Sequence, residues 1–182
     1  MIFQSTDIDG VVLITPEPIA DERGFFAKTW GQDDFEAHGL NTRIVARNLS
    51  YNRDRATLRG MHFQHPPHAE TKLISCIAGS IFDVAIDLRR DSPTCGRWVG
   101  ARLRAESGAM LYVPEGFAHG YLTLEPQTTV EYLISEFYAP HAADGVRWDD
   151  PTFGITWPLE PEVINQRERT WPDFSGAPIR SR

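Results

Sequence analysis

The sequence predicts an all-β fold, a barrel or jelly roll with short helices at its margins. Glycine and proline, 14 and 13 of the 182 residues, are spread along the chain and separate short segments instead of forming one linker. The segments between them are rich in β-branched and aromatic residues, which favour strands. No long stretch with helical spacing lies between these segments, so a sandwich or barrel is favoured over alternating strands and helices.

The composition is typical of one globular domain, which we place at residues 1–182. The chain has 25 acidic and 18 basic residues, a formal net charge of −7, which argues against nucleic acid or an anionic membrane as the main partner. No apolar run approaches the roughly 18 residues that cross a bilayer. The first ten residues lack the order of a signal peptide, and Cys76 and Cys95 are the only cysteines. We therefore expect a cytoplasmic protein.

Five segments carry the strongest strand signal. They are Val11–Ile14, Lys72–Ile77, Ser80–Leu88, Met110–Val113 and Thr128–Ser135. Within the third segment, apolar residues alternate with Asp83 and Asp87, the period of two that a strand shows. These two carboxylates are therefore predicted to face either solvent or the interior of a barrel.

The connections and helices are predicted from local signals. The Ala78-Gly79 link predicts a tight hairpin between two of the strands. A short helix is predicted at Asp33–His38, between Gly31 and Gly39, and another at Pro161–Arg169, which opens with a proline allowed in a first turn.

Residues that could carry chemistry gather in residues 58–72. This segment contains Arg59, His62, His65, His68 and Lys72. His119 follows in a loop bounded by Pro and Gly, and Tyr132 lies on the apolar face of a predicted strand. Singly, such residues are usually structural, since a His near Pro is commonly a turn residue and a Tyr on such a face is commonly core. That explanation weakens if all of them lie at the mouth of one small barrel.

One interpretation of this cluster is a divalent metal site. Its ligands would be His62, either His65 or His68, Glu70 and His119, because imidazole and carboxylate suit iron, nickel or zinc. The spacing does not favour it, since residues three apart on a strand point to opposite faces and no His-x-His pair occurs. A nearby lysine would also repel a cation. We therefore predict that the site holds no metal.

The other interpretation is proton transfer. A base such as His62, an acid such as Tyr132 and a cation such as Lys72 could abstract a proton beside a ketone, stabilise the enolate and return a proton to the opposite face. Guanidinium groups bind phosphate bidentately. The arginines predicted to hold an anionic substrate in this way are Arg23, Arg59 and Arg167.

Six segments of the chain resemble the dTDP-4-dehydrorhamnose 3,5-epimerase family nearly from end to end. They are Asp21–Phe26, Leu58–Gln64, Asp83–Arg89, Ser92–Thr94, Pro114–Gly120 and Trp148–Pro151. The resemblance implies a metal-free, cofactor-free, cupin-like jelly roll that forms homodimers by exchanging N-terminal strands. It also implies epimerisation at C3, C5 or both of a nucleoside-diphosphate 4-keto-6-deoxyhexose, in deoxysugar biosynthesis.

The resemblance further implies a role for individual residues. His62 would remove the proton, Tyr132 would supply one on the other face, and Lys72 would stabilise the enolate. His119 would line the sugar site, and Glu168 would orient the histidine base.

A second group would bind the substrate. Arg23 and Arg59 would hold the diphosphate, with Arg23 reaching in from the partner subunit, and Tyr138 would stack on the base. The remaining substrate-binding residues that the resemblance implies are Phe26, Lys28, Arg47, Asn48 and Arg167.

The chain departs from the family pattern at four places. Arg167-Glu168 stands where relatives commonly have Lys-Asp, and Glu is one carbon longer than Asp, which leaves its pairing with the histidine base open. Arg47-Asn48-Leu49 replaces Gln-Asp-Asn, and Ala143 replaces a Glu that contacts substrate. The fourth departure is Lys28, where relatives have a Glu that contacts the nucleotide base.

Lys28 bears on which nucleotide is bound. Thymine presents an N3–H donor, which suits Glu, whereas cytosine presents an N3 acceptor, which suits a lysine donor. The substrate could therefore be CDP-linked instead of dTDP-linked. The alternative is that Lys28 points to solvent and a backbone group recognises the base.

Two other functions remain open on the sequence alone. One is a metal-dependent cupin oxygenase or isomerase. The other is a sugar-nucleotide binding protein without catalytic activity, which the presence of His62, Lys72 and Tyr132 disfavours.

Overall fold

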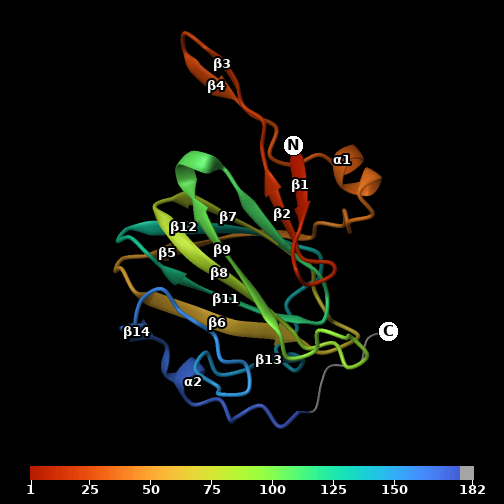
Figure 1. Cartoon of the computed structure of the whole chain (residues 1–182), viewed down its shortest axis with the longest axis vertical. Coiled ribbons are helices and arrows are strands. Elements are labelled where there is room, and N and C mark those ends of the chain that lie inside the picture. The colour runs from red at the N-terminus through yellow and green to blue at the C-terminus, as the bar shows by residue number, and fades with distance from the viewer. Residues whose placement is uncertain (177–182) are drawn as a thin grey trace.

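Two facing antiparallel sheets form the body of the protein (Figure 1). The computed structural model describes residues 1–176. The first sheet has the order β1 (Ile2–Ser5), β2 (Val12–Thr15), β10 (Met110–Val113), β7 (Lys72–Ala78), β12 (Thr128–Ile134) and β5 (Ala46–Asn52). The second has the order β13 (Ala143–Gly145), β6 (Thr57–Gln64), β11 (Phe117–Thr123), β8 (Ser80–Asp87) and β9 (Trp98–Arg104). The predicted all-β fold is therefore confirmed.

Short elements lie at the margins of these sheets. They are the β3 (Ile19–Asp21) and β4 (Gly24–Phe26) hairpin, α1 (Gln32–Ala37), the 3₁₀ turn η1 (Ala105–Ser107), β14 (Val163–Ile164) and α2 (Gln166–Arg169). Both helices are short, as the sequence predicted. Neither they nor η1, the helical elements in residues 1–176, are long and apolar enough to span a membrane.

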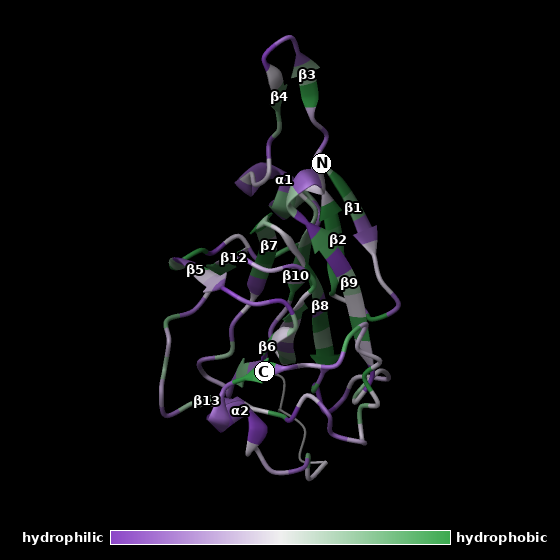
Figure 2. Cartoon of the chain, turned by 90° about the vertical axis from the view of Figure 1, so that its left-hand side faces the viewer, coloured by the Kyte–Doolittle hydropathy of each residue, from purple (hydrophilic) through white to green (hydrophobic). Residues whose placement is uncertain are grey.

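The main core lies between the two sheets. Ile74 and Val130 of the first sheet meet Ile81 and Leu103 of the second, and all four are fully buried. Apolar segments alternate with polar ones along these strands in Figure 2. Burial of such side chains stabilises the fold by roughly 1.5–3 kcal/mol each.

Strand β8 has both of its faces buried. Asp83 shares the inward face with Ile81 and Ala85, which belong to the core between the sheets. The opposite face, with Val84 and Ile86, packs under the C-terminal loops. Of the two predicted alternatives, the structure shows that Asp83 faces the barrel interior.

The link at Ala78-Gly79 is a corner and not a hairpin. Strand β7 belongs to the first sheet and β8 to the second, so the chain crosses between the sheets at Gly79. Gly79 has φ +76°, and a Cβ there would lie 2.4 Å from Thr128 Oγ1. The hairpin prediction was wrong. A two-residue link can join two paired strands or carry the chain from one sheet to the other, and the local sequence does not distinguish these two cases.

The second helix prediction was too long. Only Gln166–Arg169 is helical, and it begins where the Asn165 side chain accepts a hydrogen bond from the Arg167 backbone N–H. Val163–Ile164 instead adds a parallel strand to β6. Pairing with an open edge of β6 overrides the local helical signal.

The β3–β4 hairpin projects beyond the body of the barrel (Figures 1 and 2). Three large apolar side chains on it are about 70% exposed, namely Ile19 at 72%, Phe25 at 71% and Phe26 at 71%. The hairpin therefore has an apolar surface that no other part of residues 1–176 covers.

Asp87 fastens the end of β8 to the loop that follows it. Its carboxylate accepts hydrogen bonds from Ser92 Oγ at 2.5 Å, Thr94 Oγ1 at 2.7 Å and Arg89 Nη2 at 2.8 Å. Burial alone would raise the pKa of Asp87, but the hydrogen bonds from Arg89, Ser92 and Thr94 outweigh it and lower the pKa below its ordinary value.

Replacing Asp87 with Asn should lower the free energy of unfolding by about 3–5 kcal/mol at neutral pH, because Arg89 is left without its buried partner. The lowered pKa means that this stabilisation is present above the pKa of the unfolded state and disappears as the pH falls through that of the folded state. Urea unfolding from pH 7 to pH 3 should show the difference from the native protein shrinking with acid. The exposed Asp91→Asn is the control, and a pH-independent deficit in Asp87→Asn would contradict this account.

Candidate active site

The predicted residues converge on one pocket inside the barrel. It has a volume of about 580 Å³ and is lined from both sheets and from α2. The predicted residues that line it are Asn48, Arg59, His62, Lys72, His119, Tyr132, Tyr138 and Arg167. Glu168 does not line the pocket but lies next to His62, with its Oε1 2.8 Å from His62 Nε2.

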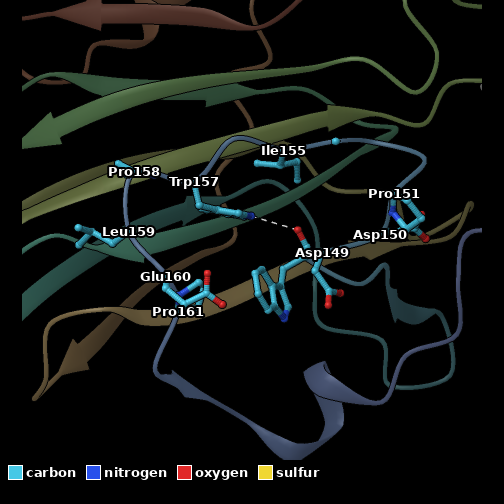
Figure 3. Close-up of a pocket in the computed structure, with 11 residues that line it drawn as sticks. Asp149, Asp150, Pro151, Ile155, Trp157, Pro158, Leu159, Glu160 and Pro161 are labelled. Atoms are coloured by element: carbon cyan, nitrogen blue, oxygen red, sulfur yellow. Dashed lines mark hydrogen bonds between the residues drawn. The ribbon is translucent and has the colours of Figure 1, made fainter.

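A second pocket of about 410 Å³ lies in the loop of residues 148–161 (Figure 3). None of the predicted site residues lines it. Trp157 Nε1 donates to the Trp148 carbonyl at 3.1 Å, which holds the loop together. Asp150 accepts hydrogen bonds from the backbone N–H of Thr152 and of Phe174. These polar groups serve loop structure, and the barrel pocket is the stronger candidate.

His62 and Glu168 lie side by side at one wall of the barrel pocket, as an ion pair whenever His62 is protonated. His62 Nε2 lies 2.8 Å from Glu168 Oε1, and Glu168 is 6% exposed. The longer side chain of Glu therefore does reach the histidine, which answers the question left by the sequence. A carboxylate on one ring nitrogen fixes the tautomer and leaves Nδ1 as the nitrogen that can accept a proton.

Trp171 packs against His62 of this His62–Glu168 pair, and the sequence analysis did not identify it. Its ring meets that of His62 edge to face, with the centroids 5.4 Å apart. Trp171 packs on Gly145, which pairs with His62 across β13 and β6, and a Cβ on Gly145 would lie 2.2 Å from the ring. A tryptophan close after the Arg167-Glu168 pair could have suggested a role at the site. No local sequence pattern, however, indicates that it contacts β13.

Tyr132 lies on β12, in the sheet opposite His62. Burial raises the pKa of Tyr132 well above that of an ordinary tyrosine, and the neighbouring Tyr121 adds to the rise. The neutral hydroxyl of Tyr132 is therefore strongly favoured over its phenolate. The two proposed proton-transfer groups thus approach the pocket from different sheets.

Lys72 lies between two partners inside the pocket. Its Nζ is 2.8 Å from Glu70 Oε1 and 3.4 Å from the His62 carbonyl, and the residue is 7% exposed. The carboxylate of Glu70 offsets the cost of burying this ammonium. Glu70 thus acts as the anion that holds Lys72, whereas the metal interpretation gave it the role of a ligand.

His119 is held by a buried carboxylate. Its Nε2 lies 2.8 Å from Asp83 Oδ1, and both residues are nearly inaccessible to solvent. Burial raises the pKa of Asp83, although His119 and Lys72 oppose that rise. Sequence reasoning placed Asp83 on β8 but did not identify it as the partner of His119.

Two guanidinium groups lie at the wall of the pocket. Arg59 Nε donates to Asn52 Oδ1 at 2.8 Å. The guanidinium carbon of Arg167 lies 6.0 Å from the centre of the Trp171 ring. Arg59 Nη2 also donates to the Tyr51 carbonyl and Arg167 Nη2 to the Ala143 carbonyl, and among residues 1–176 the other guanidinium N–H groups are left to bind an anion.

Arg47 was predicted at the site but faces away from it. On β5, Ala46, Asn48 and Ser50 line the pocket, and strand alternation turns Arg47 to the other face. There it pairs with Glu131 at 2.6 Å. The prediction placed neighbouring residues of one strand on the same side, which the pleat forbids.

Arg23, Phe26 and Lys28 also lie outside the pocket of their own chain. Arg23, on the projecting hairpin, pairs with Asp21. Lys28 lies just beyond the hairpin and pairs with Asp33 at 3.1 Å and with Asp34. Of the basic residues predicted at the site, Arg59, Lys72 and Arg167 line the pocket, whereas Arg23, Lys28 and Arg47 do not.

The histidine triplet does not form a metal site. His65 pairs with Asp144 at 3.1 Å, and His68 packs against His141, so neither lines the pocket with His62. Over residues 1–176, no three His, Cys, Asp or Glu side chains are grouped so that they could hold an ion.

Comparison with known proteins gives one consistent result. The family model for dTDP-4-dehydrorhamnose 3,5-epimerase matches residues 5–176. A dTDP-4-dehydrorhamnose 3,5-epimerase of Methanothermobacter thermautotrophicus is 42% identical over 180 residues, 97% of this chain and 96% of that protein. A dTDP-4-dehydrorhamnose 3-epimerase of Streptomyces niveus is 39% identical over 170 residues, 93% of this chain and 82% of that protein.

A solved structure agrees. It is a dTDP-6-deoxy-D-glucose-3,5-epimerase from Legionella pneumophila in complex with dTDP-4-keto-L-rhamnose. The TM-score is 0.91 at 32% identity, over 100% of this chain and 98% of that one, which confirms the cupin-like jelly roll. Because the family model matches residues 5–176 of its 182 residues, this chain belongs to the dTDP-4-dehydrorhamnose 3,5-epimerase family and is an isomerase of deoxysugar biosynthesis.

Proposed function

We propose that this chain inverts both C3 and C5 of a dTDP-linked 4-keto-6-deoxyhexose, with His62 as base and Tyr132 as acid. The observation that carries this proposal is that the two residues project into one pocket from opposite sheets, β6 and β12. Inversion at carbon requires removal of a proton from one face and delivery to the other. A base and an acid on facing walls meet that requirement.

The other pocket residues supply charge. Lys72 stabilises the enolate oxygen that develops at C4, and Glu168 stabilises the imidazolium that forms on His62. Arg59 and Arg167 hold the diphosphate, His119 lines the sugar site, and Asn48 and Tyr138 hold the nucleotide. These steps need acid, base and fixed charge alone, and we propose that no metal or cofactor takes part.

Two substitutions separate the roles of base and acid. His62→Ala should slow deuterium uptake from D₂O into the sugar by about 10²–10⁴-fold, because the general base is removed. Tyr132→Phe should retain deuterium exchange at the carbon but lose inversion, because His62 can return the proton only to the face from which it came. NMR on dTDP-4-keto-6-deoxyglucose reports exchange and inversion together.

The control for both variants is His141→Ala, at an exposed position outside the pocket. It should exchange and invert at the native rate, and a chelator should slow none of these reactions. Unchanged exchange in His62→Ala would refute the base, and equal loss of exchange and inversion in Tyr132→Phe would refute the acid.

The nucleotide is proposed to be dTDP. The relatives are dTDP-sugar enzymes by name, and Lys28, the residue that suggested CDP, pairs with Asp33 and Asp34 outside the pocket. Within its own chain, Lys28 is therefore not placed to donate a hydrogen bond to the N3 acceptor of cytosine.

Calorimetry should show dTDP binding at least about tenfold more tightly than CDP, a difference of about 1.4 kcal/mol. Lys28→Ala should leave this ratio unchanged, since its cation is engaged by two carboxylates. Tighter binding of CDP, or a change in the ratio on Lys28→Ala, would restore the CDP hypothesis.

We also propose a homodimer that exchanges its N-terminal hairpin, in the cytoplasm. The exposed Phe25 and Phe26 on that hairpin would be covered by a second copy. Phe26 and Arg23 would then reach the partner's pocket. The free thiols of Cys76 and Cys95 agree with a reducing compartment.

Complementation tests the exchange. Arg23→Ala and His62→Ala chains, each impaired alone, should regain activity when unfolded together and refolded as mixed dimers. In a mixed dimer, the chain that keeps His62 receives Arg23 from its partner, so one of its two sites is intact. No gain on mixing would mean that Arg23 does not serve the partner's site.

A further inference from the structure

Gln64, the last residue of β6, is a buried amide that the proposed mechanism leaves without a role. It is 3% exposed, lines the barrel pocket and is hydrogen-bonded to two loops, residues 65–71 and residues 135–142. Burial of an amide costs stability unless its hydrogen bonds are made. The partners of Gln64 therefore indicate what it does.

One set of these hydrogen bonds encloses Tyr138. Gln64 Oε1 accepts from the backbone N–H of Ala139 at 2.7 Å, and Nε2 donates to the backbone carbonyl of Phe137 at 3.2 Å. Tyr138 itself is 69% exposed and lies in no strand or helix. Its ring thus depends on the backbone for its position, and Gln64 holds that backbone on both sides.

The other set of hydrogen bonds leads to Lys72. Gln64 Nε2 also donates to the His68 carbonyl at 2.9 Å and to Glu70 Oε2 at 3.3 Å. The second oxygen of Glu70, Oε1, lies 2.8 Å from Lys72 Nζ. Gln64 therefore fixes both the carboxylate of Glu70 and the loop that carries it, and this carboxylate holds the ammonium that we assign to the enolate.

The surroundings of the Gln64 amide allow one orientation only. The backbone N–H of Ala139 can only donate, whereas the carbonyls of His68 and Phe137 and the ionised carboxylate of Glu70 can only accept. The two amide hydrogens are shared among these three acceptors. Neither hydrogen is left for a substrate, which argues for positioning and against direct binding.

We propose that Gln64 is a positioning residue that sets Tyr138 for the nucleotide and, through Glu70, Lys72 for the sugar. One side chain thereby fixes the two ends of the pocket relative to each other. A misplacement of about 1 Å at a reacting group can cost about 10²-fold in rate. The inference rests on the proposed roles of Tyr138 and Lys72.

Gln64→Met keeps the length of the side chain and removes its four hydrogen bonds. Calorimetry should show dTDP bound about tenfold more weakly, the scale of a lost stacking contact on one base. In a Tyr138→Ala background the same substitution should weaken dTDP binding no further, because Gln64 acts on the nucleotide through Tyr138. A direct contact with dTDP, or a general loss of structure, would instead give the same loss in both backgrounds.

The reaction rate tests the connection to Lys72. Gln64→Met should lower kcat by about 10²-fold, and in a Lys72→Ala background it should slow the residual deuterium exchange no further. Glu70→Ala leaves both contacts to the Tyr138 loop intact, so it should lower kcat and leave dTDP binding native. Weaker dTDP binding in Glu70→Ala would contradict the separation of the two sets of contacts.

The matched control is Thr123→Val, which also removes the acceptor of a buried backbone N–H. Thr123 is fully buried, and its Oγ1 accepts from the Thr57 N–H at 2.9 Å outside the pocket. This variant should lose stability in urea unfolding, as Gln64→Met does, but keep native dTDP binding and kcat. Weaker dTDP binding in Thr123→Val would show that any such loss of stability disturbs the pocket.

The possible failures are distinguishable. If the native protein neither exchanges nor inverts the sugar, the proposed function fails, and the calorimetric comparison still decides whether Gln64 acts through Tyr138. If the native protein turns over and Gln64→Met binds dTDP and turns over equally well, or loses the same factor in every background, the positioning role is refuted while the function stands.

Discussion

His62 and Tyr132 belong to different sheets, and the packing of those sheets fixes the distance and direction between them. The core formed by Ile74, Val130, Ile81 and their neighbours sets how closely the sheets approach. A barrel built this way presents opposite faces of a bound ring to different strands. In the proposed mechanism, the architecture therefore determines the stereochemistry of the reaction, because the sheets already hold the proposed acid and base on opposite sides.

The second constraint is that the buried or half-buried Lys72, His119 and His62 of the barrel pocket each lie beside a carboxylate. Lys72 is held by Glu70, His119 by Asp83, and His62 by Glu168. Buried charge costs stability unless it is paired, and the pairs here are aimed into the pocket. Glu168 Oε2 and Asp83 Oδ2 are buried without hydrogen-bond partners among the described residues. The site thus retains polar groups that the fold alone would not require, as is common where function is favoured over stability.

Much of this arrangement could be predicted from the sequence, and the limits have physical causes. Alternation along residues 80–88 located β8 correctly, but only the pairing of sheets could show that both of its faces are buried. Arg47 was misplaced because family resemblance outweighed the period of two along β5. The contacts of Gln64 and Trp171 were missed because they join segments that are far apart in the sequence. Single-sequence patterns report local conformation well and cross-sheet contacts poorly.

The most direct test of the account is a crystal structure of this chain with an unreactive dTDP-hexose that lacks the 4-keto group. The sugar ring should lie in the barrel pocket, with His62 against one face and Tyr132 against the other, and with Lys72 beside O4. A sugar bound with both side chains on the same face, or bound in the pocket of residues 148–161 instead, would contradict it.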